Sequence, residues 1–240
     1  MRPLAAICQP HYLPWIGYFE MIDRVDVFVF LDDVQFIQRE WKNRNRIRGE
    51  RRGQEPKWLS VPVQRECKRG TPIHETLLSE GSWRQEHLDS FRHVYRGAPF
   101  LSDALDLLRS GLDRPHRFLG PFNEAIVREI CIYLGIHRRF ERSSELGCPG
   151  RKTERLVNLC QAVEARAYLA NNGSAGYLDG SLFEAQGLEW EFQDYSHPSY
   201  EQWDGGESLP FLSHLSILDL IANHGPASLD ILRLGRGSHA

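Results

Sequence analysis

The chain has 240 residues, of which 41% are hydrophobic and 25% are charged, and its formal net charge is -3. These values predict a globular protein with a substantial core and give no argument for a surface that binds nucleic acid or anionic membranes. No stretch approaches the roughly 20 apolar residues that a membrane-spanning helix needs. The N-terminus carries only Arg2 before a short strand-like run, which is not a signal-peptide pattern, so we expect a cytoplasmic protein.

The five cysteines, at positions 8, 67, 131, 148 and 160, include no Cys-x-x-Cys pair. Their odd number and wide spacing argue against a disulfide framework and against a cysteine-rich zinc site. Cys8 ends the first predicted strand and is therefore a candidate nucleophile, although a small buried side chain is the simpler interpretation.

The start of the chain predicts a βαβ unit. Residues 4–8 form an apolar run, residues 18–22 have helical spacing, and residues 26–31 form a second apolar run that ends at Asp32 and Asp33. In a right-handed βαβ unit, the ligand crevice lies beyond the carboxyl ends of the strands. We therefore expect a site at that edge of the sheet.

The rest of the chain predicts a continued α/β pattern. A basic segment at 38–52 comes before a predicted strand at 58–63, and residues 73–78 are compatible with another short strand. The predicted helices at 82–95, 100–112 and 118–134 follow one another without a strand between them, which indicates a helical insertion over residues 81–136. The alternation resumes with a helix at 153–165, a strand at 166–170, a helix at 177–186, a strand at 188–195 and a helix at 216–223. We expect one α/β domain over residues 1–240, with a Rossmann-like, mostly parallel sheet and helices on both faces.

Acidic and histidine side chains at strand ends are the candidate catalytic groups. Asp32 and Asp33 directly follow an apolar strand, where one of them has helix capping as its structural alternative. Asp194 lies three residues before His197, close enough in sequence to orient its imidazole for acid–base catalysis, and the alternative is a polar loop held by its own hydrogen bonds. His11 lies in a loop that two prolines make rigid, and a turn that covers the core is the alternative.

Amide, aromatic and basic side chains near the same edge are the candidate binding groups. The run at 42–46 mixes lysine, asparagine and arginine, and arginine offers a planar fork to phosphate or carboxylate, although such runs are usually solvated loops. The loop at 171–176 precedes a helix N-terminus, which favours anions, but it lacks the spacing of a dinucleotide-binding or P-loop motif. The predicted substrate-binding residues are Gln9, Tyr12, Trp15, Gln35, Asn43, Arg44, Asn45, Asn171, Gly173, Ser174, Tyr200 and Gln202. No cofactor follows from these motifs, and no metal site is predicted.

Several long motifs resemble the WbqC-like protein family. They begin with Gln9-Pro10-x-Tyr12-x-Pro14-Trp15-x-Gly17-Tyr18-Phe19, the stretch 26–36 and Trp41-x-Asn43-Arg44-Asn45, and they continue over essentially the whole chain through Lys152-Thr153-Glu154-Arg155-Leu156, Gln193-Asp194-Tyr195, His197-Pro198-x-Tyr200 and Leu215-Ser216-Ile217-x-Asp219-Leu220. Two places depart from the family. Members often read Ser-Gly-x-Gly-Ala where this chain has Asn171-Asn172-Gly173-Ser174-Ala175, and position 8, often His or another residue in relatives, is Cys8.

The resemblance implies a bacterial cytoplasmic protein associated with O-antigen, other surface-polysaccharide or specialised-metabolite pathways. The layout of residues 13–36 is also similar to the start of pantothenate synthetase and related nucleotidyl-transferring folds. Gly17-Tyr18 stands where those enzymes have the Gly-His of a His-x-Gly-His signature. Because such histidines stabilise phosphate charge, their absence argues against standard adenylyl transfer.

These observations predict a transferase that binds an activated or phosphorylated small molecule, which includes nucleotide-activated molecules. The enzyme would modify a sugar or an amine. The expected reaction class is acyl or aminoacyl transfer. The alternative is a non-catalytic nucleotide-sugar-binding or scaffold protein of the same pathway, with a shallow apolar patch on the helices of residues 82–134 and no converging acid and base. A metal-dependent hydrolase using Asp32, Asp33 and His11 or His197 is a third hypothesis. The expected partner is a small molecule rather than nucleic acid, and assembly into a homo-oligomer is left open.

Overall fold

The computed structural model describes residues 3–49, 55–67, 70–204 and 207–237. Its main sheet has five strands, all paired in parallel, in the order β5-β2-β1-β6-β7. These strands are β1 (Leu4–Cys8), β2 (Val27–Phe30), β5 (Arg139–Arg142), β6 (Ala167–Ala170) and β7 (Glu189–Phe192). The predicted Rossmann-like α/β fold is therefore confirmed.

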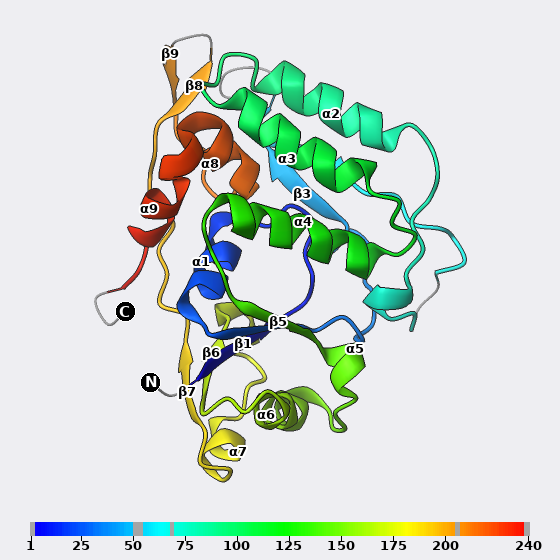
Figure 1. Cartoon of the computed structure of the whole chain (residues 1–240), viewed down its shortest axis with the longest axis vertical. Helices are drawn as coiled ribbons and strands as arrows, with labels where there is room; N and C mark the ends of the chain where they lie inside the picture. Colours follow the sequence, from blue (N-terminus) through cyan, green and yellow to red (C-terminus); the bar gives the residue numbers. More distant parts are fainter. Residues whose placement is uncertain (1–2, 50–54, 68–69, 205–206, 238–240) are drawn as a thin grey trace.

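The helices and the remaining strands surround this sheet (Figure 1). The helices are α1 (Ile16–Arg24), α2 (Trp83–Val94), α3 (Leu101–Asp113), α4 (Leu119–Tyr133), α5 (Ser143–Leu146), α6 (Lys152–Ala162), α7 (Gly180–Glu184), α8 (Ile217–His224) and α9 (Ser228–Arg233), with short 3-10 helices η1 (Ile73–Glu75), η2 (Asn172–Ser174) and η3 (Gly225–Ala227). The remaining strands form two antiparallel pairs, β3 (Arg44–Ile47) with β4 (Lys57–Ser60), and β8 (Gln202–Asp204) with β9 (Glu207–Leu209).

Alternating side chains of the strands divide the core into two layers. Ala6 and Phe28 pack with α1 and α4 in the larger cluster, which also includes the helices α2, α3 and α8. Ile7 and Val29, one residue further along the same strands, pack with α6 and α7 in the smaller cluster. Because successive residues of a strand face opposite ways, apolar runs on β1 and β2 supply both layers at once. Figure 1 shows α1 and α4 on one side of the sheet and α6 and α7 on the other.

The order of the strands reverses at β1. The chain leaves β1 toward β2 and β5 on one side, and later adds β6 and β7 on the other side. Loops that leave the carboxyl ends of β1 and β6 therefore turn toward opposite faces of the sheet, and the crevice between them is the usual ligand position in open α/β sheets. The fold thus marks one place for a site.

Three segments differ from the sequence-based expectation. The basic segment expected as a loop contains β3, which pairs with β4 outside the main sheet. The prediction of a short strand at 73–78 is wrong at its start, because Ile73–Glu75 is a 3-10 helix. The edge strand β5 was not predicted, since its four residues, Arg139–Arg142, contain a single apolar side chain. None of the helices in the described part of the chain is both long and apolar enough to cross a membrane.

Candidate functional site

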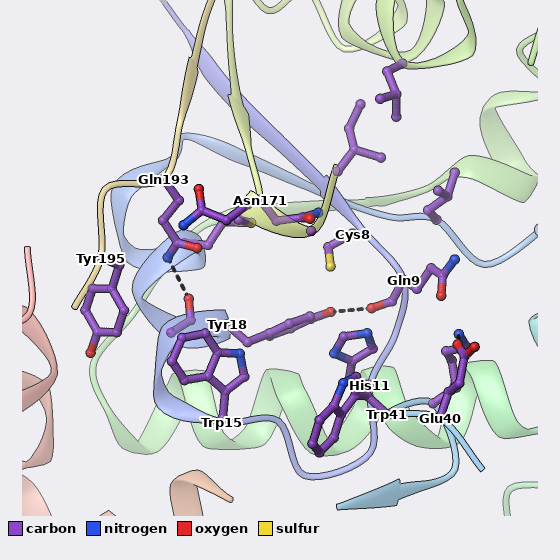
Figure 2. A pocket seen from close by; sticks show the side chains of 18 of the residues that line it. Cys8, Gln9, His11, Trp15, Tyr18, Glu40, Trp41, Asn171, Gln193 and Tyr195 are labelled. Carbon is purple, nitrogen blue, oxygen red and sulfur yellow. Dashed lines mark hydrogen bonds and ion pairs between the residues drawn. The ribbon is translucent and has the colours of Figure 1, made fainter. Parts of the chain in front are cut away.

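A cavity of about 440 Å³, here called the main pocket, lies at the carboxyl ends of β1, β6 and β7. One amide side chain from the end of each strand lines it: Gln9 after β1, Asn171 after β6 and Gln193 after β7. Figure 2 shows Asn171 and Gln193 on one side of the Tyr18 ring and His11 on the other. The pocket therefore occupies the crevice that the reversal of strand order creates.

A second cavity of about 230 Å³, here called the side pocket, adjoins the main pocket. His11, Trp15 and Trp41 line both cavities, and Arg46 and His214 are found only in the lining of the side pocket. The two cavities thus lie next to each other and share one wall of aromatic rings.

The loop that carries His11 is held from β3. The Asn45 side-chain amide donates hydrogen bonds to the carbonyl oxygens of Tyr12 (3.1 Å) and Leu13 (2.7 Å), and its oxygen accepts from the Arg46 backbone N–H (2.7 Å). Leu13 has φ of 44°, in the left-handed region that a leucine rarely adopts. The amide of Asn45 stabilises this conformation, so its side chain acts mainly on the loop although it also lines the side pocket.

Gly17 allows the Trp15 indole to lie across the first turn of α1. A Cβ at position 17 would come within 2.3 Å of the Trp15 ring. The indole stacks on His214, with 5.2 Å between ring centroids, and on His197, with 6.0 Å. A glycine at this helix position therefore shapes the wall that separates the pocket from the His197 region.

His11 is a neutral imidazole in the wall between the two cavities. Its ring lies against Tyr18, with 5.2 Å between the ring centroids. In the described part of the chain neither ring nitrogen has a hydrogen-bond partner. Burial, with a smaller contribution from the positive charge of Lys42, lowers the pKa of His11 to about 3. The ring is thus uncharged near neutral pH and keeps a nitrogen lone pair for a ligand.

Lys42 brings a positive charge into the main pocket. It is only 4% exposed, and its ammonium pairs with the carboxylate of Glu40, which also lines the pocket. An ammonium has three N–H donors, so the pair with Glu40 leaves donors for a second acceptor. A buried cation with an unfilled donor is suited to an anionic group of a substrate.

Cys8 also lines the main pocket, but its thiol is not activated. Burial raises its pKa to about 12, and the opposing effects of the Gln9 backbone and Lys42 are smaller. Since the thiolate is the reactive form, this cysteine stays a protonated, buried side chain near neutral pH.

Some of the sequence-predicted site residues meet in these cavities. The main pocket is lined by Gln9, His11, Trp15, Asn171 and Gly173, and the side pocket by His11, Trp15 and Asn45. Residues from the first and second halves of the chain thus converge at one edge of the sheet, and their roles remain predictions.

Asp32 and Asp33 lie at the predicted edge but outside the lining of both pockets. Asp32 is 1% exposed and accepts hydrogen bonds from the Ser144 backbone N–H (3.0 Å) and hydroxyl (2.8 Å) at the start of α5. Asp33 pairs with Arg155 of α6 and accepts a hydrogen bond from the Ser143 hydroxyl (2.6 Å). Both carboxylates connect β2 to the helices that follow β5.

No hydrogen bond or ion pair joins Asp194 to His197 in the described part of the chain, and neither residue lines the main pocket or the side pocket. Nδ1 of His197 donates to the Pro198 carbonyl oxygen (2.8 Å), and Asp194 is exposed. Burial lowers the pKa of His197. His197 lies behind two lining residues, Trp15 (6.0 Å between ring centroids) and His214 (4.9 Å).

The other predicted binding residues are engaged in local contacts. Tyr200 and Gln202 both donate to the Asp219 carboxylate (2.7 Å each), the Tyr12 hydroxyl lies 2.8 Å from Nδ1 of His87, and the Asn43 amide donates to the Val61 carbonyl oxygen (3.0 Å). Ser174 donates to the Asn171 carbonyl oxygen (2.7 Å), Gln35 lines a separate surface hollow, and Arg44 lies over Trp58.

Sequence reasoning missed several lining residues, notably Glu40, Tyr168, Tyr177 and Gln193, and it considered Lys42 only as part of the basic run at 42–46. Gln193 had a usable signal, because it follows β7 just as Gln9 and Asn171 follow β1 and β6. Its Nε2 donates to the Gly17 carbonyl oxygen (2.8 Å) and to Glu20, which fixes the start of α1 against β7. Among the described residues, no three or more His, Cys, Asp or Glu side chains form a group that could hold a metal ion.

Comparisons with known proteins agree with the motifs of the sequence. The family model described as the WbqC-like protein family matches residues 9–231. The chain is 36% identical over 233 residues to the uncharacterized protein Rv1507c of Mycobacterium tuberculosis, which covers 96% of this chain and 98% of that relative. No solved structure matches the chain. The chain therefore belongs to the WbqC-like protein family.

Proposed function

We propose that the protein is a transferase that binds an activated, anionic small molecule in the main pocket and transfers an acyl or aminoacyl group to an amine, such as that of an amino sugar. The observation that carries this proposal is the pairing of a neutral His11, whose ring nitrogens have no hydrogen-bond partner in the described part of the chain, with the buried Lys42 ammonium. Both line a cavity at the carboxyl ends of parallel strands. A proton acceptor and a cation are the two groups that acyl transfer uses.

In the proposed reaction, the amine nitrogen attacks the acyl carbonyl carbon and forms the new C–N bond. The bond from that carbon to the leaving group of the donor then breaks, and the leaving group departs with the electron pair. His11 accepts the proton that the nitrogen loses, and Lys42 stabilises the negative charge on the carbonyl oxygen or on the leaving group.

The charge of the substrate adjusts His11 for this role. In the empty pocket, burial and Lys42 together hold the pKa of His11 low. An anionic group beside Lys42 offsets the second of these causes, so the pKa of His11 rises toward its ordinary value when the substrate binds. The imidazole then becomes a stronger base at the stage at which the reaction needs one.

The state of Cys8 favours direct transfer between two bound substrates. A protonated thiol with a pKa of about 12 is a poor nucleophile, so an acyl-enzyme on this cysteine is not part of the proposal. Initial-rate kinetics should therefore show a sequential pattern rather than a ping-pong one.

We further propose a cytoplasmic role in a bacterial surface-polysaccharide pathway, O-antigen-like, or in a specialised-metabolite pathway, as the motifs of the chain imply. A scaffold would instead present an apolar surface on the helices α2, α3 and α4. Among the large hydrophobic side chains that are exposed in the described ranges, Ile132 alone comes from these helices. This supports the enzyme over the scaffold.

The test begins with thermal stabilisation by a panel of nucleotide-linked amino sugars and of acyl and aminoacyl donors, because a ligand that binds the native state raises its melting temperature. Stabilising pairs are then incubated together, and mass spectrometry is used to detect the amide product. We expect product with the wild-type chain and its loss in His11→Ala. The matched control is His93→Ala, since His93 is exposed on α2. Stabilisation without any product would replace the transferase with the non-catalytic binding protein, and undiminished turnover in His11→Ala would remove His11 from the mechanism.

A further inference from the structure

Four side chains next to the side pocket form a continuous surface, here called the Arg–Trp face: Trp41, Arg44, Arg46 and Trp58. The Arg44 guanidinium lies 4.0 Å from the centroid of the Trp58 ring, and the Arg46 guanidinium lies 5.8 Å from Trp58 and 5.4 Å from Trp41. The two indoles are 5.6 Å apart at an angle of 35°. Each guanidinium group thus lies over an indole ring, and the two indoles contact each other.

The β3–β4 hairpin explains this arrangement. Arg44 and Arg46 are two residues apart on β3 and therefore share one face, while Asn45 and Ile47 point inward and are buried. Trp58 of β4 lies directly opposite Arg46 in the ladder. The strand thus places two guanidinium groups on the outside, at a spacing of about 7 Å along the chain.

The indoles of the Arg–Trp face are unusually open to solvent. Trp41 is 42% exposed and Trp58 is 41% exposed, whereas Tyr12, Phe28 and Phe122 are fully buried. Exposed aromatic side chains that gather in one place commonly mark a binding surface, since burying them against a ligand is favourable.

The cations of this face lack anionic partners. In the described part of the chain neither Arg44 nor Arg46 forms an ion pair; Arg46 donates only to the His214 carbonyl oxygen (3.0 Å), and the Nε atoms of both arginines are buried without a hydrogen-bond partner. Most other arginines near the sheet pair with a carboxylate, as Arg142 does with Glu124 (2.7 Å). The unpaired guanidinium groups therefore create a local positive field, and a planar fork of N–H donors matches the oxygens of phosphate.

The Arg–Trp face continues into the two pockets. Trp41 lines both cavities, and Arg46 lines the side pocket together with His11. A ligand whose reacting end lies at His11 can therefore extend along the side pocket and across the hairpin.

We propose that the Arg–Trp face binds the nucleoside diphosphate part of an activated substrate, with the diphosphate on Arg44 and Arg46 and the base stacked on Trp58 or Trp41. This inference rests on the proposed function, because it places the nucleoside diphosphate of the same substrate whose reacting end lies in the main pocket. Stacking on an aromatic ring accepts any base, so the surface itself selects the diphosphate and a planar group rather than one nucleotide. The same chemistry belongs to a nucleotide-linked sugar acceptor and to a coenzyme-type acyl donor that carries adenosine diphosphate.

Isothermal titration with UDP, dTDP, GDP, ADP, coenzyme A, inorganic pyrophosphate and uridine tests the proposal. We expect at least one nucleoside diphosphate to bind, with an affinity that falls as salt rises, and uridine to bind far more weakly. Preference for UDP, dTDP or GDP would indicate that the diphosphate belongs to a nucleotide-linked sugar acceptor. Preference for ADP or coenzyme A would indicate that it belongs to the coenzyme-type acyl donor. Failure of all the diphosphates to bind at millimolar concentration would overturn the proposal.

Variants of the face locate the binding. Arg44→Gln and Arg46→Gln should each weaken binding of the diphosphates and of pyrophosphate by about tenfold, and Arg46→Lys should do so less because it keeps the charge but not the fork. The double variant Trp41→Ala, Trp58→Ala should weaken nucleoside diphosphates more than pyrophosphate. Arg92→Gln, which alters an exposed arginine paired with Asp89 (2.8 Å) on α2, is the matched control. Unchanged melting temperatures establish that the variants fold, and wild-type affinity in the double variant Arg44→Gln, Arg46→Gln would overturn the proposal.

The outcome is separable from that of the proposed function. Nucleoside diphosphate binding that depends on Arg44 and Arg46, without any transfer reaction, would retain the face and reject the transferase. Amide formation that depends on His11 but is unaffected by the arginine variants, in both KM and kcat, would retain the transferase and reject the face.

Discussion

The Asn45 side-chain amide lies 2.7 Å from the carbonyl oxygen of Leu13, and this bond holds a buried leucine with φ of 44° in the loop between His11 and Trp15. The same Nδ2 reaches the Tyr12 carbonyl oxygen at 3.1 Å, so a single side chain satisfies two carbonyl groups of the loop that carries His11. The geometry of the candidate site is thus set from β3, outside the main sheet.

Asn45→Ala should therefore destabilise the protein. It leaves two carbonyl oxygens and the Arg46 backbone N–H without their partner, at a cost of about 1–3 kcal/mol in the free energy of unfolding. Urea denaturation measures the loss. Asn158→Ala is the control, because the Asn158 amide donates to a carbonyl oxygen at an exposed position (3.0 Å) and should cost less. Equal losses in the two variants would mean that the loop does not depend on Asn45.

Gly17→Ala should displace the Trp15 indole. An added methyl group would lie 2.3 Å from the ring carbons, so the indole must move even though alanine favours a helix by about 1 kcal/mol over glycine. We expect a lower melting temperature and a changed near-ultraviolet circular dichroism spectrum. Gly176→Ala is the control, since a Cβ there meets nothing within 4 Å. A stabilised Gly17→Ala protein with an unchanged spectrum would contradict the assigned role of the glycine.

The parts of the fold that were predicted are those in which hydrophobic periodicity decides the structure. Strands β1, β2 and β6 have continuous apolar runs, because both faces of a parallel sheet are buried, whereas the edge strand β7 alternates glutamate with Trp190 and Phe192. β5 has only Phe140 as an apolar side chain, and β3 alternates arginine with asparagine, so neither has this pattern. β3 is stable because its inward polar residue, Asn45, finds backbone carbonyl partners that only the folded loop supplies.

The sequence predicts a site at the edge of the sheet where the cavities lie, but only some of the predicted side chains line them. Sequence places Asp32 at the end of β2, but it does not show that α5 begins where the Ser144 backbone N–H donates to that carboxylate. Lys42 belongs to a basic run that reads as a solvated surface, yet its side chain is buried in the main pocket. Both outcomes depend on the direction of a side chain in an irregular segment, which no periodic pattern specifies.

The contribution of His11 and His87 to the stability of the protein should decrease as the pH falls from about 6.5 toward 4. The native state keeps His11 and His87 neutral, with pKa values lowered to about 3 and about 4 by burial, while the unfolded chain protonates both near the ordinary value of 6.5. The unfolded state therefore binds more protons in this range, and each histidine contributes a slope of about 1.4 kcal/mol per pH unit. Denaturation measured at several pH values should give a smaller slope for His11→Gln than for the wild type, and an unchanged slope would show that His11 is not held neutral.

Asp32→Asn should lower the stability of the protein without a comparable loss in kcat. The carboxylate accepts hydrogen bonds from the Ser144 N–H on one oxygen and from the Ser144 hydroxyl on the other, and the single amide oxygen of asparagine cannot replace both, at a cost of about 2 kcal/mol. Because Asp32 lies outside both pockets, kcat per folded molecule should stay close to the wild-type value. A kcat that falls as far as in His11→Ala, with a native melting temperature, would restore Asp32 to a catalytic role.

Lys42→Met should raise the pKa of His11 and abolish the binding of anionic substrates. The variant removes the second cause of the low pKa, while burial, the larger cause, remains, so the pKa should move upward without reaching the ordinary value. Titration of the His11 ring protons by nuclear magnetic resonance, in the wild type and in the variant, measures this shift directly. Arg24→Met is the control, because it removes a cation that pairs with Glu191 (2.7 Å) and does not line the pocket. An unmoved His11 titration in Lys42→Met would show that the ammonium does not act on the imidazole, and the proposed adjustment of His11 by substrate charge would then have no physical basis.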